Sequence, residues 1–240
     1  MFPSFDFDNG SIKVNCPDGY LSWSDLHRIY DRDSMLKANL RKAPKLSYRA
    51  LHPGNKKQDV PLALSIFDET TISAAKDYFP GRKDMSSFLN IIHTWWLIAN
   101  SKEQFNPNPV GNAVVEGDGK IEFFRKLADW IENWQESPFF TLTPNTSSAL
   151  IATLRAQASL IEDLLAEGYD YVMVGRFQSD PLERRFSQYR QMSGGRFLVA
   201  LGEVYNSERI LACRSLIMED VNFWKEDLKP QHVDENVQEF

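Results

Sequence analysis

The residues best suited to chemistry lie in one segment, Phe177 to Gly195, with the sequence FQSDPLERRFSQYRQMSGG. Asp180 and Glu183 stand three positions apart at the start of a predicted helix, with Pro181 between them. This spacing is typical of a capping box, with Asp180 as N-cap, Pro181 first in the helix and Glu183 reaching back to the cap. The same helix could instead present a carboxylate to a divalent cation, which prefers oxygen ligands. Residue types alone favour the cap.

The faces of that helix can be predicted from its periodicity. Three apolar or aromatic side chains are expected to point inward: Leu182, Phe186 and Tyr189. Glu183, Ser187 and Arg190 then share a neighbouring face. On that face the carboxylate of Glu183 could bind a divalent metal ion, and the Arg190 cation could bind a phosphate.

Arginines surround these carboxylates. Five occur within 21 residues: Arg176, Arg184, Arg185, Arg190 and Arg196. Such a cluster suits the phosphate backbone of a nucleic acid, and it equally suits a solvated helix face.

Other chemistry finds little support. The pairs Trp95-Trp96 and Trp130/Trp134 have helical spacing and are more often core than base-stacking residues. The run Pro53–Lys57 lacks the spacing of a phosphate-binding loop and is expected to be a turn. No pairing of a nucleophile with a histidine base can be identified.

The net charge of −6 excludes a polycationic protein, but the charge is unevenly distributed. Residues 37–57 contain seven basic side chains and no acid, whereas residues 216–240 contain seven acids and two lysines. A basic stretch on an acidic body can still contact phosphate locally.

Two cysteines and four scattered histidines give neither a disulfide framework nor a zinc site. No apolar run reaches the roughly 20 residues that a membrane-spanning helix needs, and the first residues do not resemble a signal peptide. A soluble protein of a reducing, intracellular compartment is therefore expected, with no membrane partner.

Six or more helices and few strand signals predict a mainly α fold with minor β. Helices are expected from Ser22 to Tyr30, from Ser34 to Arg41, from Asp59 to Pro80 and from an Asp84 cap. Further helices follow after Lys120, after the cap and proline Thr143-Pro144, after Asp180, and within 197–228. A short strand is expected at Tyr169–Val174.

The chain resembles the P-element-like, THAP-family DNA transposases over nearly its whole length. The matching stretches are 43–67, 88–102, 127–134, 146–172 and, above all, GRFQSDPLERRFSQYRQMSGGRFLVAL at 175–201. Such transposases have a zinc-binding THAP domain, a coiled coil and an RNase H-like core interrupted by a helical GTP-binding insertion. Two aspartates and one glutamate of that core hold two Mg²⁺ ions that activate water or a 3′-hydroxyl.

The resemblance assigns roles to individual residues. Glu183 falls on the metal-binding catalytic glutamate. Residues implied at the nucleotide are Asp180, Lys45, Val60, Trp96 and Asn100, and residues implied at DNA are Arg184, Arg185, Arg190 and Arg196. Leu97 stands where an aspartate would read the guanine edge, and leucine cannot accept those hydrogen bonds, which costs about 1–3 kcal/mol. The resemblance thus implies GTP, while Leu97 argues against a guanine preference.

The implied organisation has four parts. Residues 1–42 correspond to a remnant of the RNase H-like core, 43–174 to the insertion domain, 175–228 to the carboxy-terminal part of the core, and 229–240 to an acidic tail. The first two catalytic aspartates and the THAP domain align upstream of Phe2. We therefore expect a carboxy-terminal part of a nuclear transposase that alone neither cuts nor joins DNA.

The partners implied are transposon-end DNA, GTP and a second copy of the chain. Two alternatives stay open. The chain could be an inactive or co-opted module that binds a nucleotide, DNA or a protein, or a helical protein that retains the ancestry without its use.

Overall fold

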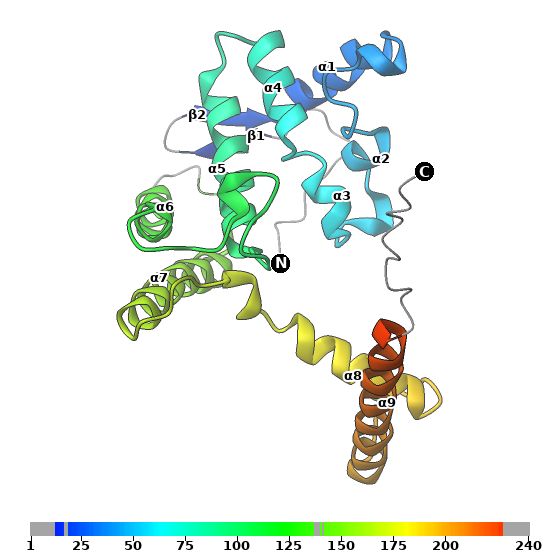
Figure 1. Ribbon diagram of the computed structural model, residues 1–240. Helices are drawn as coiled ribbons and strands as arrows, with labels where there is room; N and C mark the ends of the chain where they lie inside the picture. Colours follow the sequence, from blue (N-terminus) through cyan, green and yellow to red (C-terminus); the bar gives the residue numbers. More distant parts are fainter. Residues whose placement is uncertain (1–12, 17–18, 137–139, 141, 228–240) are drawn as a thin grey trace, which may run out of the picture. The chain divides into compact units, whose positions relative to one another are not determined.

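The computed structural model describes residues 13–16, 19–136, 140 and 142–227, and these residues are mainly helical (Figure 1). One antiparallel pair of strands is the only sheet among them. The predicted mainly α class with minor β is therefore confirmed. The chain divides into two compact units, residues 1–177 and residues 178–240, and each is described by itself. Within the described part of the chain, no helix has the length and apolarity to cross a membrane.

Over its described residues, the first unit contains the strand pair, seven α-helices and short 3₁₀ turns. Its elements are β1 (Lys13–Cys16), β2 (Gly19–Ser22), α1 (Trp23–Ser34), α2 (Tyr48–Leu51), α3 (Val60–Leu64), α4 (Glu69–Tyr78), α5 (Lys83–Ala99), α6 (Lys120–Gln135) and α7 (Pro144–Ala166). The strand register pairs Lys13 with Ser22 and Cys16 with Gly19. The second unit contains α8 (Asp180–Met192) and α9 (Leu201–Asp227).

Helix α5 connects two hydrophobic cores of the first unit, and it lies between α4 and α6 in Figure 1. Its amino-terminal half, with Phe88 and Leu89, joins the core formed with β2 and α1 to α4. Its carboxy-terminal half, with Ile98, joins the core formed with α6 and α7. Helix α6 also contributes to both cores, with Trp134 in the first and Phe124 in the second, so α5 and α6 together hold the first unit.

The first core combines side chains from either side of residue 43. Leu26 and Ile29 of α1 are buried with Leu46 and Leu51. Residues 19–42 and the residues that follow therefore share one core, and the first unit ends at 177. Which part of a transposase each stretch corresponds to stays a prediction.

Helices α6 and α7 have the structure that the sequence predicts. The apolar stripe of α6 is buried at Phe124, Leu127, Ala128, Ile131 and Trp134. Thr143 caps α7 by accepting a hydrogen bond from the Thr146 amide, with Pro144 in the first turn. Gly168 follows the last turn of α7 with a φ of 101°, which a glycine adopts without steric cost.

A half-buried guanidinium ties the strand pair to α1 and α5. Arg82 donates to Asp25 at 2.7 Å, to Asp84 at 3.0 Å and to the Tyr20 carbonyl at 2.7 Å. The prediction that Asp84 caps its helix is wrong, because α5 begins at Lys83 and Asp84 lies in its first turn. The Asp84 carboxylate instead accepts from Arg82 and from the Tyr20 amide.

A buried carboxylate holds the chain after α1 against α4. Asp33 accepts a hydrogen bond from the Ala43 amide at 2.5 Å and from the Tyr78 hydroxyl at 2.6 Å. The hydrogen bond to Asp33, followed by burial, raises the pKa of Tyr78 to about 12. Ionisation of Tyr78 would therefore oppose this contact.

Replacing Tyr78 with phenylalanine is expected to lower the free energy of unfolding at pH 7 by about 1 kcal/mol, because buried Asp33 loses a donor. The Tyr78 pKa is higher in the folded than in the unfolded chain. Its contribution is therefore complete below pH 10 and is lost as the pH rises toward 12. Urea unfolding at pH 7, 10 and 11 should show the difference between the two proteins shrinking, and a constant difference would contradict this origin.

Other predicted elements are shorter or divided. The helix expected from Asp59 to Pro80 is two helices, because Asp59 caps α3 and Asp68 caps α4. The second helix expected from Ser34 is reduced to a 3₁₀ turn at Ala38–Leu40, since α1 itself continues to Ser34. The strand expected at 169–174 is a single bridge between Val172 and Val114.

Candidate functional site

In the second unit, one carboxylate joins α8 to α9. Glu208 of α9 accepts from Arg185 Nε at 2.7 Å and from Arg185 Nη2 at 2.6 Å, and it also accepts from the Tyr189 hydroxyl. The hydrogen bonds from Arg185, followed by that from Tyr189, lower the pKa of Glu208, and the hydrogen bond to Glu208 raises the pKa of Tyr189. Arg185 and Tyr189 thus define the side of α8 that meets α9.

The predicted cap at Asp180 is wrong by one residue. Helix α8 begins at Asp180, and Ser179 is the N-cap, without a side-chain hydrogen bond to a backbone amide. The Ser179 hydroxyl donates instead to Glu183 Oε1 at 2.9 Å. Glu183 is exposed in the first turn, so its orientation is set by Ser179 and not by a capping box.

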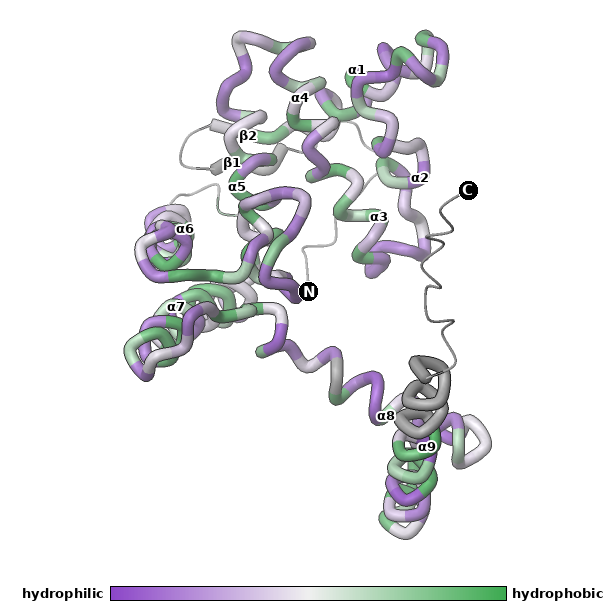
Figure 2. The backbone as a smooth tube through the Cα atoms, viewed as in Figure 1, coloured by the Kyte–Doolittle hydropathy of each residue, from purple (hydrophilic) through white to green (hydrophobic). Residues whose placement is uncertain are grey.

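The predicted buried face of α8 is also partly wrong. Tyr189 is buried, but Leu182 is 63% exposed and Phe186 is 55% exposed. The reason is that α9 lies on the Arg185 and Tyr189 side of the helix. The apolar residues of α9 are spread around the helix and form no single face to receive Leu182 and Phe186. Figure 2 shows hydrophobic and hydrophilic residues mixed along the coloured part of α9.

The four arginines predicted at DNA divide into two groups. Arg185 is held by Glu208, and Arg196 lies 3.7 Å from Glu203. Arg184 is exposed and Arg190 is half-buried, and neither is paired with a carboxylate in the part of the chain that the structure describes. Two of the four cations are therefore available for an outside anion without breaking an ion pair.

The predicted metal ligand Glu183 lies beside Asp180, both exposed on the first turn of α8. Their oxygens are of the type that Mg²⁺ prefers. No group of three or more His, Cys, Asp or Glu side chains suited to one metal ion is found among the described residues. That Glu183 binds a metal ion therefore stays a prediction.

The residues predicted at a nucleotide come from the stretch between α1 and the start of α3, from the end of α5, and from the second unit. The Lys45 ammonium donates to Asp68 at 2.7 Å, and Val60 is the exposed first residue of α3. Trp96 and Asn100 lie at the end of α5, where the Asn100 amide donates to the Trp96 carbonyl at 3.0 Å. Asp180 belongs to the second unit.

The Lys45 ion pair is strengthened at the start of α4. Burial pushes the pKa of Asp68 upward, but hydrogen bonds from Lys45 and Thr70 outweigh it, so the pKa is lowered. The pKa of Lys45 is raised by the same hydrogen bond. An anionic ligand at Lys45 would therefore compete with Asp68.

The end of the first unit is fixed against α5. The Val174 amide donates to the Ser101 hydroxyl at 3.1 Å, and the Gly175 amide donates to the Ser101 carbonyl at 2.9 Å. A Cβ atom at Gly175 would lie 2.9 Å from the carbonyl carbon of Asn100, so this close approach requires glycine. The end of α5 and the chain leading toward α8 are thus held together.

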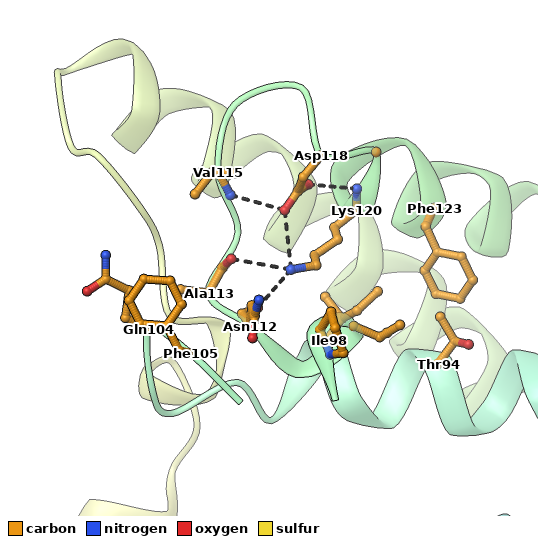
Figure 3. Close-up of a pocket in the computed structure, with 13 residues that line it drawn as sticks. Thr94, Ile98, Gln104, Phe105, Asn112, Ala113, Val115, Asp118, Lys120 and Phe123 are labelled. Carbon is orange, nitrogen blue, oxygen red and sulfur yellow. Dashed lines mark hydrogen bonds and ion pairs between the residues drawn. The ribbon is translucent and has the colours of Figure 1, made fainter. Parts of the chain in front are cut away.

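A cavity of about 550 Å³ in the first unit was not predicted (Figure 3). It is lined by α5, the 104–119 connection and the start of α6, and mostly by apolar side chains such as Phe105 and Phe123. The Lys120 ammonium in this cavity donates to the Asn112 and Ala113 carbonyls and lies 3.2 Å from Asp118. None of the predicted nucleotide residues lines it.

Comparison with known proteins gives one fold match. The chain is similar to a chain of the Drosophila P element transposase strand transfer complex, with a TM-score of 0.65 and 15% sequence identity. The match covers 84% of this chain and 47% of that chain, so this chain spans about half the length of that transposase. Neither a protein-family model nor a curated protein sequence matches. The resemblance in the sequence is therefore confirmed at the level of the fold, which this chain shares with a P element transposase.

Proposed function

We propose that this chain is the carboxy-terminal part of a P-element-like DNA transposase, with α8 at the DNA. The carrying observation is the shared fold, which extends over 84% of the chain. In support, α8 presents Glu183, Arg184 and Arg190 together within two turns. In the full-length protein the function would be DNA cleavage and strand transfer.

Within this proposal, Glu183 is the third metal-binding carboxylate of the full-length enzyme. Bound Mg²⁺ would activate water or a 3′-hydroxyl toward a phosphodiester. Two ions need several carboxylates that converge on one point, and this chain is assigned one of the three. No catalytic step is therefore attributed to the chain by itself.

The second unit is proposed to contact the phosphate backbone through Arg184 and Arg190. Replacing both with glutamine should weaken binding to a 30-base-pair duplex about tenfold, and it should reduce the slope of log K against log salt by about 2, because two phosphate contacts are lost. Fluorescence anisotropy between 50 and 200 mM salt measures both quantities.

The matched control is the double variant Arg125→Gln and Arg155→Gln. It removes the same charge from the first unit, where Arg125 pairs with Glu162 and Arg155 with Glu132. Equal weakening by both double variants would show a general charge effect and would remove the assignment of α8 to DNA.

The alternative function is a module that binds a nucleotide without chemistry. It follows from the resemblance, which implies Trp96 and Asn100 at a nucleotide; Asn100 donates to the Trp96 carbonyl, and its backbone lies against Gly175. Titration calorimetry with GTP and with ATP measures whether the chain binds a nucleotide and whether it prefers guanine to adenine. Because Leu97 replaces the guanine-reading aspartate, comparable heats are expected if a nucleotide binds, and no heat with either nucleotide removes this alternative.

A further inference from the structure

A second cationic surface lies on the first unit, outside every residue assigned above to DNA. It is formed by residues 37–57, called here the basic segment, which contains seven basic residues and no acid in a chain of net charge −6. The segment leaves α1, passes through α2 and ends before α3 (Figure 1).

Two of its lysines attach the basic segment to α4. Lys42 donates to Asp77 at 2.8 Å, in the last turn of α4, and Lys45 donates to Asp68 at 2.7 Å, at its N-cap. The Ala43 amide donates to buried Asp33 between them. The backbone of the segment is thus fixed along one helix, and these lysine charges are neutralised.

Four other cations of the segment point outward. Lys37, Arg41, Arg49 and Lys56 are exposed, and over the described residues none of them is paired with a carboxylate. Holding uncompensated cations on a fixed backbone raises the local positive potential, which attracts an anionic partner.

An aromatic stack fixes α2 among these cations. The Tyr48 ring stacks on His52 with centroids 4.1 Å apart and an angle of 21°, and His52 meets His27 of α1 at 4.8 Å. Burial first, and then the nearby His52, lowers the pKa of His27, so His27 is neutral at pH 7. Tyr48 is 61% exposed and lies next to Arg49, so an accessible ring and hydroxyl accompany the charges.

We propose that the basic segment is a second DNA-contact surface, which binds the backbone of duplex DNA through Arg41, Arg49 and Lys56. The proposal rests on the proposed function, which places DNA beside this chain. A duplex carries one negative charge per about 1.7 Å of axis, so cations spread along a fixed segment can each meet a phosphate. The segment itself contains no carboxylate that would repel this backbone.

The test uses the full chain with Arg41→Gln, Arg49→Gln and Lys56→Gln combined, and a 30-base-pair duplex measured by anisotropy from 50 to 200 mM salt. The control, Arg125→Gln, Lys126→Gln and Arg155→Gln combined, removes the same charge from cations that are paired with Glu162, Glu122 and Glu132. The basic-segment variant is expected to bind the duplex at least about tenfold more weakly than wild type. Its slope of log K against log salt should be smaller by about 3, because three phosphate contacts are lost. The affinity of the control should stay within about threefold of that of wild type.

The outcomes separate this proposal from the proposed function. If the basic-segment variant binds like wild type while the Arg184 and Arg190 variant is weakened, the second surface is refuted and the function stands. If the wild-type chain does not bind duplex DNA at 50 mM salt, the proposed function fails together with it.

A membrane surface is the competing partner, since Met35 just before the segment and Leu40 within it are exposed. Binding of the wild-type chain to phosphatidylserine vesicles that the basic-segment variant loses, with unchanged DNA binding, would overturn the proposal. Combining the basic-segment and α8 substitutions should multiply their separate losses of DNA affinity, because the two sets of residues are in different compact units and share no contact that the structure describes.

Discussion

Replacing Phe124 with alanine is expected to lower the free energy of unfolding by about 4 kcal/mol, because a large-to-small change in a well-packed core leaves a cavity. Phe124 is 0% exposed and lies in the core that α6 shares with α7 and with Ile98 of α5. Urea or thermal unfolding followed by circular dichroism measures the loss.

Phe105 provides the control for that substitution. It is 73% exposed on the connection before α6, so its replacement with alanine should change the free energy of unfolding by less than about 0.5 kcal/mol. A loss below about 1 kcal/mol for Phe124→Ala would show that α6 does not pack as described.

Replacing Arg82 with methionine is expected to destabilise the first unit by about 3 kcal/mol, because one partner of a largely buried ion pair is removed. Asp25, with 8% of its side chain exposed, would lose its 2.7 Å contact, and Asp84 would lose three hydrogen bonds. Methionine keeps a similar length and apolar stem, so the charge and its hydrogen bonds account for most of the change.

The comparison for Arg82 is Lys42→Gln, measured by the same unfolding experiment. Lys42 and Asp77 form an exposed pair at 2.8 Å, which is expected to contribute less than about 1 kcal/mol. Equal effects of the two substitutions would mean that the Arg82 network is no stronger than a surface ion pair.

Periodicity and capping patterns in the sequence correctly predicted helices α6 and α7. The stripe of α6 and the Thr143-Pro144 start of α7 depend on residues a few positions apart, so periodicity and capping rules were sufficient. The Arg82 network joins Tyr20 and Asp25 to a residue about 60 positions later, and no local rule predicts which acid a distant arginine meets.

The errors at α8 have a common physical cause. Serine and aspartate are both good N-caps, so Ser179 and Asp180 compete, and a shift of one residue changes the partner of Glu183. Leu182 and Phe186 were predicted inside because they are apolar, but the position of α9 on the helix is set by the Glu208 contacts with Arg185 and Tyr189.

The candidate sites were predictable to different degrees. Glu183 and the arginines of α8 share one helix, so their proximity follows from spacing alone. The nucleotide residues come from distant segments, and their joint approach stays a prediction. The cavity beside Lys120 was missed because no local pattern in the connection before α6 shows that its fold leaves a space against α5.

The most direct test of the central claim asks whether α8 touches DNA. A photo-crosslinking phenylalanine derivative in place of Ser187 would lie one turn after Glu183. The same substitution at Ala156, on the exposed side of α7, serves as the control. The account predicts a cross-link to duplex DNA at 50 mM salt from position 187 that disappears when Arg184 and Arg190 are replaced by glutamine. Absence of a cross-link from position 187, or equal cross-linking from position 156, would contradict it.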